Sequence, residues 1–353
     1  MKSFLGLLLF IMLFSCHDGG KGDAVVLDLN DAEERLEYSF FADSVSYLTL
    51  RLDENEYIGN IERLYHRDGF YYIWGSHRSG IFVFDDTGKQ YSHIDAYGEG
   101  PNDFRDISSF SVVLSTGDVC ILDYASQKLK FYGKDGRFQY SEPCPHWSVD
   151  LCVPDSEHKI FISPFYAGDE NPSGVWVGDS NNIPINHLID DVTPDHQFYY
   201  YPMTYNIGDS CLYYYDRNWD NFFAITKRDA HVLHRFEVKQ KIPLSIMRDI
   251  MQNPLKLDGY AICDRFAYSH SKTLMLYCLF NYEGNKDERS YVWVVMDSRN
   301  KQVRLAHKLY NDLDHVQIDN DELFYIDEMT WARVCDGEAD DLDIRIQLLH
   351  LYD

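Results

Sequence analysis

A repeat of 48 residues constrains this chain more than any other feature of its sequence. A shift of 48 positions places Gly69 on Gly117 and Gly88 on Gly136, and each glycine stands between two runs rich in aromatic and β-branched residues. Tight turns between strands need a positive φ, which glycine adopts without strain. Each copy therefore predicts four strands joined by tight turns, which is the content of one blade of a β-propeller.

Later parts of the chain carry looser versions of the same pattern. Residues 221–238 and 291–309 each predict two strands joined by a polar turn, and residues 323–326 and 344–352 supply strands for a last blade. About 330 residues divided by the repeat length gives roughly seven units, which loops and a tether reduce to six. The 27 Tyr and 21 Phe residues also suit half-buried pleated surfaces. The expected fold class is all-β, a six-bladed β-propeller with four-stranded antiparallel blades.

The first residues indicate export. An apolar run from Phe4 to Phe14 follows Lys2, and this run is typical of a signal peptide and too short to span a bilayer as a helix. It ends at Cys16, after which the sequence turns polar and glycine-rich, an arrangement that resembles a bacterial lipobox. A plain signal peptide in which Cys16 is incidental is the alternative. The expected organisation is a lipoprotein signal peptide over 1–15, a lipidated Cys16 and tether over 16–23, and the propeller over 24–353.

The charge balance restricts the partners. The chain has 57 Asp and Glu against 32 Lys and Arg, a formal net charge of −25. An acidic surface repels phosphate backbones, so we expect no nucleic acid as a partner. A glycan, a peptide or an envelope protein fits better, with the membrane contacted through the lipid anchor only. We expect an outer-membrane anchor that faces the periplasm rather than the cell surface, because only Asp18 follows Cys16 closely.

A glycine-rich joint separates the first two repeats at residues 98–104 (GEGPNDF). Gly98 and Gly100 would permit unusual backbone angles and close chain passage, and Pro101 would stiffen the exit, so we interpret the three as a structural turn. A phosphate-cradling loop is the alternative. That alternative lacks a third glycine that opens a helix, and Glu99 adds negative charge.

This joint, together with residues 58–61 (IGNI) at the start of the first blade, resembles the six-bladed β-propeller lipoproteins of gut-type Gram-negative bacteria. That family is related in shape to NHL-repeat propellers. The resemblance covers residues 48–143 well and is only architectural beyond them. It implies a fold and an envelope location rather than an activity.

No catalytic, metal or cofactor motif is complete. Gly-Asp-Ser at 178–180 and 208–210, with D-x-x-H at 312–315, resembles a serine hydrolase family, but both serines lie mid-chain where Gly-Asp-Ser is good turn chemistry. His231 and His234 fall on a predicted strand, whose alternation sends them to opposite faces. We expect no catalytic residue, no metal site and no cofactor.

Cysteines give little further guidance. Seven remain after Cys16, and no C-x-x-C pair exists, which argues against a redox or zinc motif. Cys144 and Cys152 lie close together in a proline-containing stretch and are the local candidates for a disulfide.

Aromatic residues gather in one segment beside charged ones, and we take six of them as candidate ligand-binding residues: Tyr199, Tyr201, Tyr213, Tyr215, Arg217 and Trp219. Aromatic faces with polar neighbours can hold sugar rings or peptide side chains. Alternatively, the tyrosines pack between blades. The expected function is a binding or scaffolding module, and the alternative is an envelope hydrolase or lyase with an acidic site at the channel. Carboxylates with a His or Arg at the channel mouth would favour the enzyme.

Overall fold

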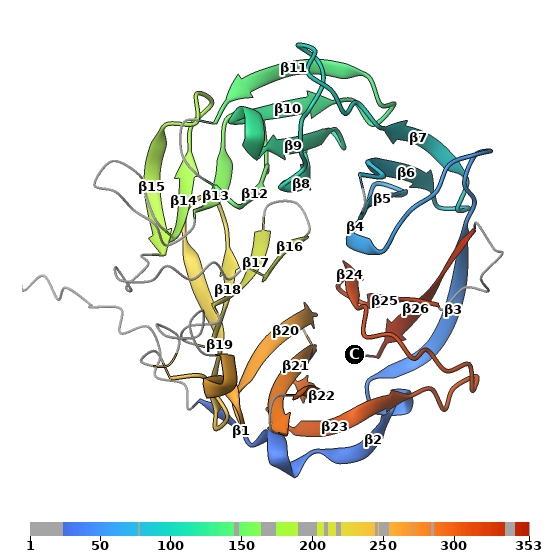
Figure 1. Ribbon diagram of the computed structural model, residues 1–353, viewed down its shortest axis with the longest axis vertical. Helices are drawn as coiled ribbons and strands as arrows, with labels where there is room; N and C mark the ends of the chain where they lie inside the picture. The colour runs from blue at the N-terminus through green and yellow to red at the C-terminus, as the bar shows by residue number, and fades with distance from the viewer. Residues whose placement is uncertain are drawn as a thin grey trace, which may run out of the picture.

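Six sheets stand around a common axis in the computed structural model (Figure 1). It describes residues 24–76, 78–144, 148–163, 174–189, 203–207, 211–216, 220–243, 246, 254–269, 271–283, 286–335 and 343–352. Each sheet is one blade of a β-propeller, and the blades are numbered here in chain order from the first repeat. The predicted all-β, six-bladed fold is confirmed.

The first three blades are four-stranded and antiparallel. Blade 1 contains β4 (Ile61–Arg67), β5 (Phe70–Gly75), β6 (Ile81–Asp85) and β7 (Gln90–Ile94). Blade 2 contains β8 (Ser109–Val112), β9 (Val119–Asp123), β10 (Lys128–Tyr132) and β11 (Phe138–Pro143), with a 3-10 turn η3 (Tyr124–Ser126) between β9 and β10. Blade 3 contains β12 (Asp150–Cys152), β13 (Lys159–Ser163), β14 (Gly174–Gly178) and β15 (Pro184–Ile189).

The last three blades take strands from both ends of the chain. Blade 4 contains β16 (Met203–Ile207), β17 (Cys211–Asp216), β18 (Asn221–Ile225) and β19 (Ala230–Val238). After a 3-10 turn η4 (Pro254–Leu257), blade 5 contains β20 (Ala261–Tyr268), β21 (Lys272–Glu283), β22 (Lys286–Asp297) and β23 (Val303–Tyr310). Blade 6 contains β24 (Phe324–Asp327), β25 (Thr330–Val334) and β26 (Ile344–Leu351).

The N-terminal segment runs along the outside of blades 4, 5 and 6 (Figure 1). β1 (Val25–Leu27) pairs in parallel with β19, and β2 (Glu33–Glu37) pairs in parallel with β23. β3 (Ala42–Leu50) is antiparallel to β26 and completes blade 6. Short 3-10 turns η1 (Leu29–Asp31) and η2 (Tyr38–Phe40) separate these strands. Two blades therefore have a fifth, parallel strand that the four-stranded prediction did not include.

The repeat glycines do what the sequence predicted. Gly69, Gly88, Gly117 and Gly136 have φ values of 77°, 78°, 74° and 81°. Such angles reverse the chain in a tight turn without a Cβ penalty. The 48-residue repeat therefore reflects the matching hairpins of blades 1 and 2.

Buried apolar runs explain how the blades pack. Along β5, Tyr71 and Ile73 pack in the cluster shared with blade 6, whereas Tyr72 packs in the cluster shared with blade 2. β6 alternates in the same way, with Phe82 facing blade 6 and Val83 facing blade 2. Both faces of a blade are covered by its neighbours. Alternate side chains along a strand therefore contact one neighbouring blade or the other, instead of alternating between core and solvent.

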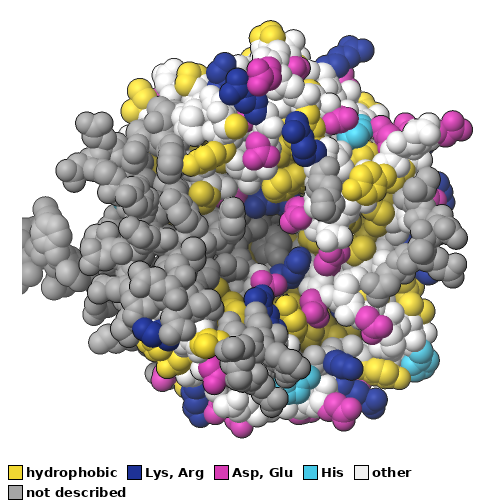
Figure 2. Space-filling model, viewed as in Figure 1, with side chains coloured by type: hydrophobic (Ala, Val, Ile, Leu, Met, Phe, Trp, Pro, Cys, Tyr) yellow, Lys and Arg dark blue, Asp and Glu magenta, His cyan; other side chains and the backbone are white. Residues whose placement is uncertain are grey.

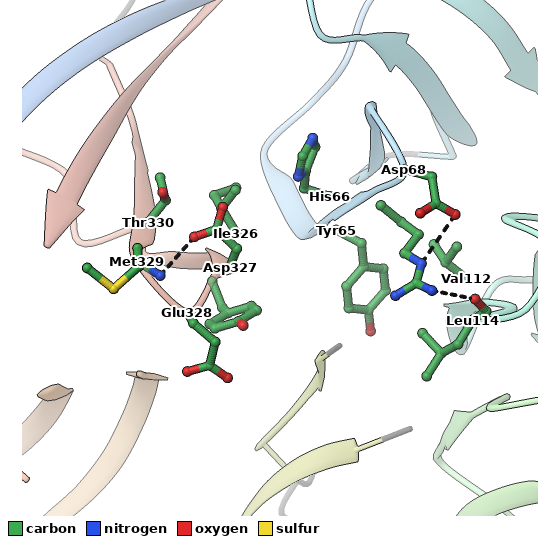
Figure 3. Close-up of a pocket in the computed structure, with 12 residues that line it drawn as sticks. Tyr65, His66, Asp68, Val112, Leu114, Ile326, Asp327, Glu328, Met329 and Thr330 are labelled. Carbon is green, nitrogen blue, oxygen red and sulfur yellow. Dashed lines mark hydrogen bonds and ion pairs between the residues drawn. The ribbon is translucent and has the colours of Figure 1, made fainter. Parts of the chain in front are cut away.

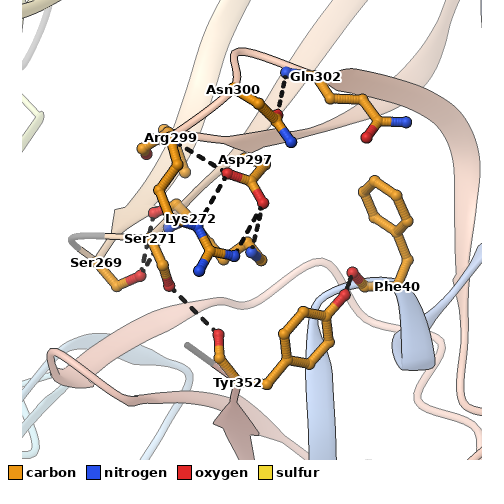
Figure 4. Close-up of polar contacts among 11 residues, drawn as sticks. Phe40, Ser269, Ser271, Lys272, Asp297, Arg299, Asn300, Gln302 and Tyr352 are labelled. Atoms are coloured by element: carbon orange, nitrogen blue, oxygen red, sulfur yellow. Dashed lines mark hydrogen bonds and ion pairs between the residues drawn. The ribbon is translucent and has the colours of Figure 1, made fainter.

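The two ends of the chain meet at blade 5 (Figure 4). Lys272 donates from Nζ to Asp297 Oδ2 at 2.9 Å, and Ser271 donates from Oγ to the Tyr352 carbonyl at 3.4 Å. The Tyr352 hydroxyl donates to the carbonyl of Phe40 in η2. Burial would raise the pKa of Asp297, but hydrogen bonds from Arg299 and Lys272 outweigh it and hold that pKa below its usual range. The two contacts of Tyr352 therefore link the end of the described chain to blade 5 and to the N-terminal segment.

Candidate functional site

A pocket of about 560 Å³ opens near the axis between blades 1, 2 and 6 (Figure 3). Its walls are the ends of the inner strands β4, β8 and β24 with the turns that follow them. We call it the mouth pocket, and its lining consists of residues 65–68, Val112, Leu114 and residues 325–330. Its volume lies in the range of small-ligand sites. Figure 2 shows charged side chains of both signs around the hollow at the axis.

Tight turns build the walls of the mouth pocket. In blade 1, Asp68 and Gly69 both have positive φ, 48° and 77°, which is the pattern of a type I′ hairpin. In blade 6, the Asp327 carboxylate accepts a hydrogen bond from the Met329 amide at 2.8 Å and so fixes the turn that carries Glu328. Short, fixed turns of this kind place side chains at the pocket with little conformational freedom to lose on binding.

The mouth pocket is acidic on balance. Asp68, Asp327 and Glu328 line it against one arginine, Arg67, whose Nε lies 3.4 Å from Asp68 Oδ2. Nη2 of the same arginine donates to the Leu114 carbonyl at 2.7 Å and so joins blades 1 and 2. The guanidinium of Arg67 is thus already bonded to neighbouring protein groups. A ligand with a positive charge would gain more at this pocket than one with a negative charge.

A histidine–carboxylate pair stands at the edge of the mouth pocket. His66 donates from Nε2 to Asp86 Oδ1 at 2.9 Å, and its ring lies 4.5 Å from that of Tyr71. Burial, together with the carboxylates of Asp86 and Asp327, raises the pKa of Tyr71 to about 12. The shift follows from burial and from the negative charge on this side of the pocket.

Arg63 joins the inner strands of three blades beside the mouth pocket. Its Nη1 and Nη2 donate to Asp150 Oδ1 and Oδ2 at 2.8 and 3.0 Å, and Nη1 also donates to Ser109 Oγ at 2.8 Å. Ser109 in turn donates to Asp150 Oδ1 at 2.5 Å. Burial raises the pKa of the neighbouring Tyr65 above its ordinary value, although Arg63 opposes the shift. The network is internally satisfied, so it supports the pocket rather than offering groups to a ligand.

The mouth pocket contains carboxylates and a histidine, the combination that the sequence analysis named as favouring an enzyme. These side chains do not form a metal site. Within the described ranges, no group of three or more His, Cys, Asp or Glu side chains could hold a metal ion. His66 and Arg67 are each engaged by an acidic neighbour, Asp86 and Asp68. The arrangement is suited to recognising charge.

Two of the six predicted ligand-binding residues are interior residues. Tyr213 is 5% exposed and Tyr215 is 1% exposed. The Tyr213 ring packs against Tyr268 of blade 5 at 4.6 Å, and the Tyr215 hydroxyl hydrogen-bonds to that of Tyr277 at 3.0 Å. Both therefore follow the alternative of packing between blades and offer no surface to a ligand. The other four, which lie outside the described residues, stay predictions: Tyr199, Tyr201, Arg217 and Trp219.

The joint at 98–104 is a turn, and one of the two reasons expected for its glycines, an unusual backbone angle, does not hold. Neither Gly98 nor Gly100 has a positive φ. A Cβ on Gly98 would lie 2.3 Å from the Asp103 carboxylate, and one on Gly100 would lie 2.7 Å from it. The prediction of unusual angles was therefore wrong in this respect, and close approach of Asp103 accounts for both glycines. Pro101 lies between them and the start of blade 2 and is exposed.

The hydrolase-like motifs are not brought together. Residues 178–180 begin the turn between β14 and β15 of blade 3, where Asp179 Oδ1 accepts from the amides of Asn181 and Ile183. The D-x-x-H segment at 312–315 follows β23 of blade 5, and Asp312 accepts from the Ser39 amide. These blades are not neighbours, and residues 208–210 lie outside the described part of the chain.

The histidine and cysteine predictions need correction. A bulge in the β18–β19 pair places His231 opposite Ala224 and His234 opposite Phe222, so both histidines share one face. Burial lowers the pKa of His234 to about 4. Cys144 and Cys152 are both buried and form no disulfide, so the predicted pairing between them was wrong. Cys16 lies outside the described residues.

Sequence reasoning missed the residues of the mouth pocket. The Asp68-Gly69 turn was identified as part of the repeat, but nothing local indicates that the turn at 327–329 would meet it. Only the order of the blades around the axis brings the two turns together. In a propeller, the turn after each inner strand is the sequence signal that would have pointed to this position.

Comparisons with known proteins agree with the fold. The family model described as a domain of unknown function (DUF4934) matches residues 24–335. A Bacteroides fragilis protein inferred to be exported has a similar structure, with a TM-score of 0.72, 13% identity and coverage of 94% of this chain and 100% of that one. A DUF4221 family member from Bacteroides vulgatus has a TM-score of 0.58, 9% identity and coverage of 88% and 98%.

Among curated proteins, no sequence matches the chain. No helix in the described ranges is long and apolar enough to cross a membrane. Structural likeness at such low identity shows the fold alone. The match over residues 24–335, which spans most of the propeller, means that the chain belongs to the DUF4934 family.

Proposed function

We propose that this protein is an exported, lipid-anchored propeller whose mouth pocket binds a peptide or protein segment that presents a basic side chain. The observation that carries the proposal is the excess of carboxylates in the mouth pocket, where Asp68, Asp327 and Glu328 accompany a single arginine. That arginine is already engaged by Asp68 and by the Leu114 carbonyl. A lysine or arginine from a partner would therefore meet a pocket with a net negative charge.

Export and anchoring rest on the leader. Residues 1–15 have the pattern of a lipoprotein signal peptide, and Cys16 is the residue that would carry the lipid. The similar Bacteroides fragilis protein is inferred to be exported as well. We place this protein at the outer membrane, on its periplasmic side.

A glycan is the weaker ligand class for this pocket. Sugar rings bind largely through the faces of aromatic side chains. Tyr65 and Tyr325 line the mouth pocket, but each is only 5% exposed. These two rings therefore offer little surface to a sugar, whereas the carboxylates of Asp68 and Asp327 are exposed.

An envelope hydrolase or lyase at the same mouth is the second candidate, and one observation favours it. The His66–Asp86 pair has the form of a base oriented by a carboxylate, with Nε2 and Oδ1 2.9 Å apart. A peptide held by Asp327 and Glu328 would lie close to that histidine. The same pocket could therefore bind a peptide and leave it intact, or cleave it with His66 as the base, and an experiment can distinguish these two outcomes.

Binding is tested with a pair of short labelled peptides that differ only in Lys against Gln at one position. We expect the Lys peptide to bind at least tenfold more tightly, which corresponds to about 1.4 kcal/mol. The double variant Asp327→Asn/Glu328→Gln should remove this preference. Glu34→Gln on the outer strand β2, an exposed carboxylate away from the axis, is the matched control and should keep it.

Equal binding of the Lys and Gln peptides would contradict the proposal. Mass spectrometry of the recovered peptide separates the two candidate functions. An intact peptide supports a binding module. Cleavage of the peptide by the unaltered protein, but not by the His66→Gln variant, would establish the enzyme instead.

A further inference from the structure

A second pocket, of about 350 Å³, lies at the other end of blade 2 from the mouth pocket. β8 runs toward the mouth pocket, where Val112 and Leu114 line the wall, and β9 runs back and ends at Asp123 in the second pocket. The joint at 98–104 forms its other wall. We call it the joint pocket, lined by residues 98–101, Asp103, Arg105, Asp123, residues 125–126, Lys128 and Lys130.

The joint pocket has cations with few partners. Lys130 is 3% exposed, and its ammonium donates only to the Pro101 carbonyl, at 3.2 Å, within the described part of the chain. An ammonium has three donors, so two remain unused. Arg105 and Lys128 are exposed, and among the described residues no hydrogen bond or ion pair involves their side chains.

Two of the three acids in the joint pocket are already committed. The Asp123 carboxylate accepts from the Arg105 amide at 3.1 Å, from the Ser126 amide at 3.3 Å and from Ser126 Oγ at 2.5 Å. Asp103 Oδ2 accepts from the Gly100 amide at 2.8 Å. Glu99 is exposed and has no bonded partner among the described residues. The unused capacity of the pocket is therefore mostly that of positively charged donors.

The backbone of the joint does not cradle an anion. The Gly100 amide is taken by Asp103, and the Gly98 amide donates to the Phe104 carbonyl at 3.0 Å. This agrees with the sequence argument against a phosphate-cradling loop. Any anion at this place would be held by side chains from β10 and from the end of the joint, which the tertiary structure brings next to the glycines.

We infer that the joint pocket binds a small ligand bearing a carboxylate or phosphate group, held by Lys130 with Arg105 and Lys128. A buried ammonium with only one acceptor is costly, and an oxyanion would supply the missing acceptors. Burial lowers the pKa of Lys130, although the charges of Asp123 and Asp103 oppose that shift, and an anion beside the ammonium would raise the pKa further. The lining holds three cations, Arg105, Lys128 and Lys130, beside three acids, which is a larger cationic share than in the chain as a whole, whose net charge is −25. This inference is independent of the function of the mouth pocket.

Isothermal titration of the protein with inorganic phosphate and with citrate, in a low-salt buffer, tests the inference. We expect saturable binding of at least one of them, and the tighter anion identifies phosphate or carboxylate as the favoured group. The affinity should fall as salt is raised, because the contacts are charged and partly exposed. No saturable binding of either anion would overturn the inference.

Charge variants sharpen the test. Arg105→Gln/Lys128→Gln changes exposed residues only and should weaken binding at least tenfold, and Lys130→Met should abolish it. Glu99→Gln removes a repelling charge and should tighten binding severalfold. Lys308→Gln, an exposed lysine on β23 of blade 5, is the matched control and should change nothing. Affinity unaltered in Arg105→Gln/Lys128→Gln, or weakened in Glu99→Gln, would overturn the inference even if Lys130→Met fails to fold.

Discussion

Gly88 lies in the second tight turn of blade 1 and touches the strand segment that closes the ring. Its φ is +78°, and a Cβ placed there would lie 2.0 Å from the Thr49 carbonyl oxygen. The Gly88 carbonyl accepts a hydrogen bond from the Arg51 amide at 2.7 Å. The residue is therefore constrained twice, by its own backbone angle and by a neighbouring backbone that cannot move aside.

Gly88→Ala should lower the free energy of unfolding by more than about 2 kcal/mol, because strain at positive φ adds to the clash with Thr49. Gly259→Ala is the matched control. Gly259 has a φ of +77°, but a Cβ there meets nothing within 4 Å, so only the backbone strain of about 1 kcal/mol remains. Urea denaturation of both variants measures the difference. Equal losses would show that the contact with Thr49 is unimportant.

Residue by residue, the sequence predicted the turns better than the site. Positive φ at a Gly turn is a local property, so Gly69 and Gly117 could be recognised from their neighbours alone. The roles of Tyr213 and Tyr215 depend on which blade covers them, and that is not local. The same tyrosine-rich strand would suit an exposed platform or a buried interface, and only the packing of blade 5 against blade 4 decides between them.

At the scale of strands, Arg63 of β4 and Asp150 of β12 form a polar link between the inner strands of blades 1 and 3. Asp150 is buried, and both of its oxygens accept from the guanidinium. Replacing one partner of such a pair leaves the other charge buried without compensation. Removal of one partner should therefore destabilise the protein more than removal of both.

Asp150→Ala should destabilise the protein by about 3–5 kcal/mol, whereas Arg63→Met/Asp150→Leu should recover part of that loss. Glu33→Ala, which removes the exposed partner of Arg304, is the control and should cost less than about 1 kcal/mol. A double-mutant cycle by chemical denaturation gives the coupling. The cycle compares Arg63→Met, Asp150→Leu and the double variant. If the losses of stability of the two single variants add up to that of the double variant, the pair does not act as a unit.

The strands of blades 1 and 2 could be predicted because each hairpin is encoded within a few residues. β1 and β2 could not, since they pair in parallel with β19 and β23, which lie about 200 or more residues later in the chain. Parallel pairing leaves no turn between its strands and hence no local sequence signal. The bulge that puts His231 and His234 on one face escaped prediction for a related reason, because strict alternation assumes an unbroken register.

At the scale of the whole molecule, the N-terminal segment both closes the ring and follows the proposed anchor. β3 completes blade 6 by pairing with β26, and Tyr352 reaches the Phe40 carbonyl. Blade 6 is therefore built from strands of both ends of the described chain, which ties the last blade to the N-terminal segment. The described chain begins at Ala24, next to β1 on the outside of blade 4, so a tether from Cys16 would join the propeller at that blade.

Lipidation of Cys16 is tested in cells fed an alkyne-bearing fatty acid. We expect the protein to be labelled and to remain with the membrane fraction after a high-salt wash, because several acyl chains anchor stably. Cys16→Ala should lose the label and become soluble, whereas Cys335→Ala should keep it. Labelling that persists in Cys16→Ala would show that the cysteine is incidental and the leader is a plain signal peptide.

The sequence by itself determined the blades, their turns and the acidic charge, because each of these depends on neighbouring residues or on composition. The tertiary structure decided where the ring closes, which tyrosines are buried and how the two pockets are made. The mouth pocket joins residues 65–68 to residues 325–330, and the joint pocket joins residues 98–101 to Lys128 and Lys130. Which turns meet depends on the circular order and closure of the blades, and pairing between distant strands leaves no periodic trace in the chain.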